Sequence, residues 1–125
     1  MFEKYLIVDD SLRRTENGFA FDAKLGYYRG LGLSMVEDLA VTIDGQPVPR
    51  SAIRFDEGKG PLSLDEMETA YDRRWGFGEV ATIAIDWPDR LSAGAHDLGL
   101  IERLRVSYMP FPSIRTTERK IVLDN

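Results

Sequence analysis

The side chains that most often carry out catalysis or bind metals are scarce in this sequence. It has one histidine, His96, and no cysteine in 125 residues. The missing cysteines exclude disulfides, thiol chemistry and a cysteine zinc site. Any metal site would therefore depend on carboxylates.

The carboxylates include four adjacent pairs, at residues 9–10, 37–38, 56–57 and 65–66. Neighbouring residues on a strand point to opposite faces, so an adjacent pair is not by default a catalytic dyad. No EF-hand spacing, HExxH, GxSxG or P-loop pattern is present. We interpret these acids as turn, cap or solvated residues, and we predict no catalytic and no metal-binding residue on this chain.

His96 follows the Gly94 turn and shares its parity with the apolar residues of a long strand-like segment. This position predicts a partly buried histidine that is hydrogen-bonded near a sheet edge. The alternative is a proton-transfer group within a composite site, which no spacing supports.

Two stretches concentrate aromatic residues and arginine, at residues 27–39 and 71–78. The first is an apolar connection between strand-like segments, so it must either cover the core or contact a partner. In the second, Trp75 and Phe77 with Arg73 and Arg74 could stack on a sugar or an aromatic ligand. The same residue types are enriched at protein interfaces, and we favour an interface.

The elements that must position these residues are short strands. Alternating runs, separated by turns every 8 to 12 residues, predict strands at residues 5–8, 19–25, 39–43, 52–55, 80–86, 95–108 and 120–123. Such spacing favours an all-β sandwich or barrel, in one domain spanning residues 1–125.

Local signals refine this expectation. Asp44-Gly45 predicts a hairpin turn, and the prolines at 47 and 49 place the return arm at a sheet edge. Ser63 and Glu66 predict a capping box that starts one short helix ending near Ala70. A bulge is expected at residues 101–103.

The composition limits the kinds of partner that we expect for this chain. The net charge is −5, the charged fraction is 30% and no basic stripe stands out, which argues against nucleic acid. No run approaches the roughly 20 apolar residues that span a bilayer, and the N-terminus does not resemble a signal peptide. We expect a cytoplasmic protein that does not contact a membrane.

The first aromatic stretch resembles the signature of the small β subunit of bacterial C-glycoside deglycosidases. The hairpin at residues 41–49, the 75–78 loop and the strand entry at 94–96 also fit. The positions that match this signature are Tyr27, Tyr28, Arg29, Gly30, Leu31, Leu33, Ser34, Met35, Glu37 and Asp38.

The resemblance implies a jelly-roll-like antiparallel β-sandwich that supports a larger TIM-barrel subunit. The larger subunit would hold a divalent metal, with manganese as the expected ion, and supply the catalytic groups. The complex would cleave the carbon–carbon bond of a 3-oxo C-glycoside by elimination, and several heterodimers would associate. We expect the partner interface to include Tyr27, Tyr28, Arg29, Gly30, Leu31, Leu33, Met35, Arg73, Arg74, Trp75 and Phe77.

Two other interpretations stay open at this point. The aromatic loop at Trp75 and Phe77 would also suit a free-standing carbohydrate-binding module. A homo-oligomeric structural protein without a ligand is the third possibility.

Overall fold

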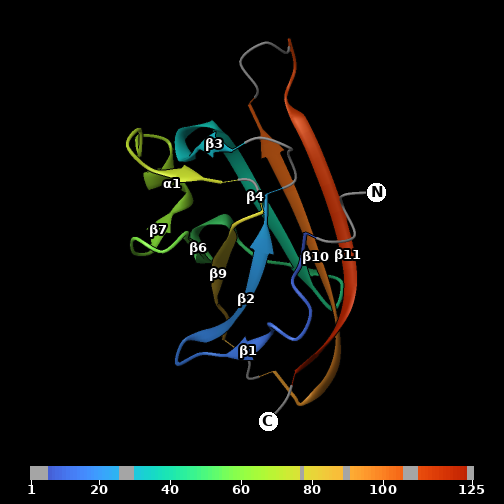
Figure 1. Ribbon diagram of the computed structural model, residues 1–125. Helices are drawn as coiled ribbons and strands as arrows, with labels where there is room; N and C mark the ends of the chain where they lie inside the picture. The colour runs from blue at the N-terminus through green and yellow to red at the C-terminus, as the bar shows by residue number, and fades with distance from the viewer. Residues whose placement is uncertain (1–5, 26–29, 77, 89–90, 106–109, 124–125) are drawn as a thin grey trace.

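The computed structural model describes residues 6–25, 30–76, 78–88, 91–105 and 110–123. Two antiparallel sheets face each other (Figure 1). The first sheet has the order β1 (Arg13–Arg14), β2 (Gly18–Lys24), β9 (Val80–Asp86), β6 (Ile53–Asp56) and β7 (Leu62–Ser63). The second has the order β11 (Ser113–Leu123), β10 (Gly94–Leu104), β4 (Val36–Ile43) and β5 (Gln46–Pro47).

The remaining elements lie at one end of the sandwich (Figure 1). They are β3 (Leu31–Gly32), β8 (Arg74–Trp75), the helix α1 (Leu64–Met67) and the 3₁₀ turn Leu33–Met35; a second 3₁₀ turn, Arg50–Ala52, precedes β6. The chain alternates between the two sheets, so that β2 pairs with the distant β9 and β4 pairs with the distant β10. The predicted all-β sandwich is confirmed, and the described residues contain one short α-helix.

The core follows the predicted alternation. Phe19 and Phe21 of β2 are fully buried, opposite Ile85 and Ile83 of β9. Burying a side chain of this size contributes about 1.5–3 kcal/mol, so these rows fix which face of the first sheet points inward. No helix among the described residues is long and apolar enough to cross a membrane.

The predicted turn and edge signals are confirmed. Asp44 and Gly45 both have positive φ, at 50° and 81°, as a tight hairpin of this kind requires. The return strand β5 holds Pro47 at the edge of its sheet, where the missing N–H breaks no ladder.

The capping box at the start of α1 is also confirmed. The Glu66 amide donates to Ser63 Oγ at 3.1 Å, and the Ser63 amide donates to the Glu66 carboxylate at 2.8 Å. The helix ends at Met67, earlier than predicted, because the next amides bond three residues back rather than four. Leu64 and Met67 are buried and hold this short helix against the core.

Three strand predictions need correction. Residues 5–8 were expected to form a strand, but within residues 6–8 only an isolated bridge, Ile7 to Ala23, is present. The last strand begins at Ser113 rather than at residue 120. The prediction missed its first part because the inward positions before Ile121 are polar, so no hydrophobic–polar alternation is visible there. β10 ends at Leu104, and the register shift against β4 falls between Arg103 and Leu104, at the C-terminal end of the predicted bulge.

Candidate partner interface

The two predicted interface stretches meet in one small sheet. β3 pairs with β8 through Leu31 opposite Trp75 and Gly32 opposite Arg74. The pairing is extended by the Arg74 guanidinium, which donates to the Gly30 carbonyl at 3.1 Å. Segments that are about 40 residues apart in the sequence therefore form a single surface at one end of the sandwich.

Two residues expected at the interface lie instead in the core. Trp75 has no exposed surface, and its ring meets Phe55 edge-on with centroids 4.9 Å apart. The Trp75 indole N–H donates to the Glu79 carbonyl at 3.0 Å. Leu33 is fully buried as well. Part of the apolar surface of both stretches thus covers the chain's own core, and the place of these two residues at a partner interface stays a prediction. The stacking platform of a sugar-binding module therefore lacks its tryptophan.

Arg73 is held within the chain. Its guanidinium forms an ion pair with Glu57, whose side chain is 5% exposed, and donates to the Gly60 carbonyl at 2.6 Å. The hydrogen bonds from Arg73 hold the pKa of the Glu57 carboxyl below its usual value. The Arg73 carbonyl in turn accepts the Leu33 amide at 2.9 Å. Arg73 therefore ties the turn at residues 56–60 to the β3–β8 sheet.

The rest of the β3–β8 surface is open to solvent. Tyr71 is 76% exposed, Arg74 is exposed, and Leu31 and Met35 are half-buried. Leu31 shares the face of its cross-strand partner Trp75 and packs against the core, so we call the other three residues, Tyr71, Arg74 and Met35, the β3–β8 patch. Tyr27, Tyr28, Arg29 and Phe77 lie outside the described residues, so their part of the prediction stays a prediction.

Gly30 shows why this arrangement needs a glycine. A Cβ at this position would lie 3.2 Å from the Trp75 carbonyl oxygen and equally close to the Arg74 side chain. At Gly30 the backbone of the first stretch therefore lies directly against the chain's own β8.

Arginine side chains extend the surface beyond Met35. The Arg105 amide donates to the Met35 carbonyl at 2.7 Å, which places Arg105 beside the β3–β8 patch. The Glu37 carboxylate accepts from Arg103 at 3.0 Å and from Arg105 at 3.3 Å. A partner docking here would meet two partly exposed guanidinium groups that share one carboxylate.

His96 has the structural role predicted for it. It is 6% exposed, its Nδ1 lies 2.7 Å from the Asp44 carboxylate, and its Nε2 lies 2.7 Å from the Ser92 carbonyl oxygen. Because both ring nitrogens face acceptors, the doubly protonated ring fits this site best. The hydrogen bond to the Ser92 carbonyl, together with Asp44, raises the pKa of His96. The ring ties the 44–45 turn to the start of β10.

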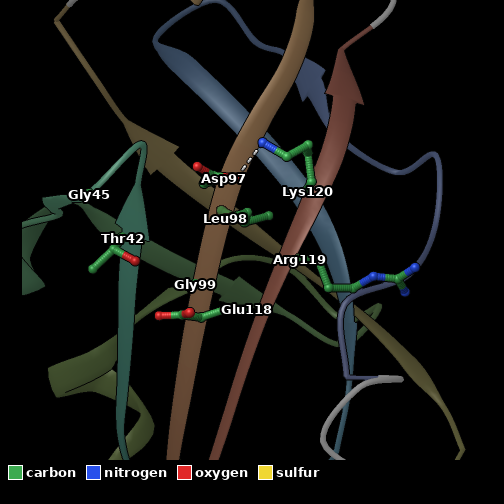
Figure 2. Close-up of a pocket in the computed structure, with 8 residues that line it drawn as sticks. All are labelled: Thr42, Gly45, Asp97, Leu98, Gly99, Glu118, Arg119 and Lys120. Atoms are coloured by element: carbon green, nitrogen blue, oxygen red, sulfur yellow. Dashed lines mark ion pairs between the residues drawn. The ribbon is translucent and has the colours of Figure 1, made fainter.

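The outward face of the second sheet has a hollow of about 510 Å³ that the sequence interpretation missed. Its floor is Gly99, flanked by Thr42 from β4 and Glu118 from β11, and it is bounded by the Asp97–Lys120 ion pair (Figure 2). A glycine inside a strand pattern was the available signal. Among the described residues, no three metal-ligating side chains converge here or elsewhere.

The fold is thus a small antiparallel sandwich with an open patch at one end. The sequence from residue 2 to residue 108 matches the family model described as C-glycoside deglycosidase beta subunit. The chain belongs to this family of beta subunits.

Curated relatives agree along most of their length. A 3'-dehydrocarminate deglycosidase beta subunit from Microbacterium sp is 36% identical over 88% of this chain and 83% of its own. C-glycoside deglycosidase beta subunits from Arthrobacter globiformis and Eubacterium cellulosolvens are each 30% identical. They cover 94% and 86% of this chain, and 95% and 78% of their own.

Proposed function

We propose that this chain is the non-catalytic small subunit of a heteromeric C-glycoside deglycosidase that acts as a carbon–carbon lyase. The partner would be a TIM-barrel subunit that holds a divalent metal and the groups that act on the substrate. Membership of the beta-subunit family carries this proposal. The joining of both predicted interface stretches in the β3–β8 sheet supports it, since it creates a patch suited to a partner.

The substrate that we propose is a C-glycoside oxidised at C3 of its sugar. One relative is named for a 3'-dehydro substrate. A C3 ketone acidifies the proton at C2, so a base can remove that proton while the aglycone leaves from C1 as a carbanion equivalent. Loss of the C2 proton and of the aglycone leaves a C1–C2 double bond in the sugar. The departing carbon of the aglycone takes up a proton, so the carbon–carbon bond breaks without any net oxidation or reduction.

We propose that this chain supports the structure of the complex and that its side chains do not take part in the chemical step. Its one histidine is engaged on both nitrogens by Asp44 and Ser92. The described residues do not offer a ligand set that fits a divalent metal. We therefore assign the metal and the base to the partner and derive no step through the metal.

The contribution of the small subunit would be to dock through the β3–β8 patch and to hold the mouth of the barrel in shape. Tyr71 and Arg74 are the side chains best placed for contact, because both are exposed and the backbone beneath them is fixed by β3 and by Arg73. Tyrosine and arginine are also the types that most often dominate binding energy at interfaces.

The docking prediction is tested by titrating the large subunit with variants of this chain. Tyr71→Ala and Arg74→Glu are expected to weaken binding by at least about tenfold each, or about 1.4 kcal/mol. Arg13→Glu reverses an exposed arginine at the opposite end of the sandwich and serves as the matched control (Figure 1). Unchanged affinity for both patch variants, with folding intact, would place the interface elsewhere.

A further inference from the structure

Two large aromatic side chains are exposed at the same end of the sandwich. Tyr71 is 76% exposed and Phe111 is 63% exposed, more than any other large hydrophobic residue that the structure describes. Phe111 precedes β11 by two residues, and β11 begins at the end of the sandwich where β3 lies (Figure 1). Aromatic side chains are enriched at binding surfaces and often dominate binding energy there, so this end is the best candidate for contact with another molecule.

Phe111 lies beyond the last cross-strand pair of the second sheet. The β10–β11 ladder ends at Leu104 opposite Ser113, and β4 begins with Val36 opposite the same Leu104. Among the described residues, no strand of this sheet continues past that level. The sheet therefore provides no neighbouring strand that could cover the Phe111 ring, and the ring stays in water unless another molecule binds it.

The backbone on both sides of Phe111 is restricted by proline. Pro110 precedes it and Pro112 follows it. A proline ring fixes its own φ near −65°, and the residue before a proline is confined mostly to extended conformations, which applies here to Phe111. A side chain on such a backbone loses less conformational freedom when it is bound. Phe111 is thus presented as a preorganised anchor.

Arg105 connects Phe111 to the β3–β8 patch. The Arg105 amide donates to the carbonyl of Met35, which belongs to the patch, at 2.7 Å. On its other side, Ser113 pairs with Leu104, the residue before Arg105, so Arg105 lies between Met35 and the residues that precede β11. The side chain of Arg105 is itself 61% exposed. The patch and Phe111 are therefore parts of one continuous surface, with a guanidinium group between them.

We propose that Phe111 is an anchor of the interface with the large subunit and enters an apolar pocket on that subunit. The inference rests on the proposed function, because it takes the β3–β8 patch as the docking surface and extends it across Arg105. Membership of a family of beta subunits implies a partner subunit, and this is the occupant that we assign to the surface. Phe111 and Met35 would form the apolar centre of this part of the interface. Arg105, which is paired with Glu37, would form its polar rim.

The test is titration of the large subunit with the full chain and its variants. Phe111→Ala should weaken binding by at least about tenfold, whereas Phe111→Leu keeps an apolar side chain and should retain most of the affinity. Val122→Ala shortens a 50% exposed aliphatic residue near the opposite end of β11 and should leave the affinity unchanged. Urea denaturation of each variant checks that the fold is retained, which is expected because these side chains are exposed.

The outcomes separate this inference from the proposed function. If Tyr71→Ala and Arg74→Glu weaken binding but Phe111→Ala does not, the anchor is overturned and the docking surface stands. If the wild-type chain forms no complex with the large subunit, both are overturned. Sedimentation velocity of the chain alone tests the other possible occupant, a second copy. A dimer of the isolated chain that Phe111→Ala dissociates would assign the ring to that contact and would also overturn the proposal.

Discussion

Replacement of Trp75 is the sharpest test of how the two aromatic stretches are used. Trp75 is the largest fully buried side chain of the described residues, packed against Phe55 and hydrogen-bonded to the Glu79 carbonyl. If this burial is right, Trp75→Ala damages the fold of the isolated chain before it affects any partner. If Trp75 were an interface residue, the same change would spare the isolated fold.

The expected magnitude follows from these contacts. Truncating a buried aromatic residue to alanine costs about 3–5 kcal/mol, including the cavity that remains. The lost indole hydrogen bond adds about 0.5–1.5 kcal/mol, at the low end because Glu79 is exposed and water can reach its carbonyl. We therefore expect a loss of about 4 kcal/mol, a large part of the 5–15 kcal/mol typical of a domain.

The assay is urea denaturation of the isolated chain. With a slope of about 2 kcal/mol per molar urea, Trp75→Ala should lower the midpoint by about 2 M. Trp75→Phe keeps the ring contact with Phe55 and should cost about 1–2 kcal/mol. Tyr71→Ala, at a 76% exposed position in the same stretch, should stay within about 0.5 kcal/mol. A Trp75→Ala chain of wild-type stability that has lost its partner would refute the burial of this residue.

Three further predictions concern polar groups inside the chain. Because the pKa of His96 is raised and that of Asp44 is lowered, the stability from their pairing should be full between about pH 4 and about pH 6.5, the ordinary pKa values of the two groups. It should fall as pH rises through the raised pKa of His96 and as pH drops through the lowered pKa of Asp44; denaturation midpoints for wild type and His96→Gln across pH would show this, and a flat difference would contradict it. Arg73→Met should lower the free energy of unfolding by about 3–5 kcal/mol, since it leaves the nearly buried Glu57 without its cation, and Arg73→Lys should recover only part of the loss. Thr117→Val should raise the free energy of unfolding by about 1 kcal/mol, because the buried Thr117 hydroxyl has no hydrogen-bond partner in the described structure; a destabilised variant would show that the hydroxyl is bonded.

Much of the fold could be predicted because local patterns and tertiary structure agree. β2 and β9 alternate cleanly, the Asp44-Gly45 turn has one favoured geometry, and the capping box fixes the start of α1. β11 was found only at its C-terminal end, since arginine and threonine occupy inward positions of an edge strand. At the edge of a sheet, the long arginine side chains can extend to the rim. The strand therefore forms although hydrophobic and polar residues do not alternate clearly along it.

The site was predicted less completely for a different reason. Composition shows that an aromatic-rich stretch must bury surface, but it does not show against what. Trp75 meets Phe55, which lies 20 positions away in the sequence, and Leu31 pairs with Trp75 across more than 40 positions. Such long-range choices depend on the assembled sandwich, and they separate Trp75 and Leu33 from the exposed Tyr71 and Arg74 beside them.

Reconstitution of activity tests the central claim most directly. The purified chain, a TIM-barrel large subunit and their mixture would each be given a 3-oxo C-glycoside, with release of the aglycone measured by chromatography. We predict no release by this chain alone, little by the large subunit alone, and sustained turnover by the mixture. Release by this chain alone, or full turnover by the large subunit without it, would contradict the assignment of this chain as a required, non-catalytic subunit.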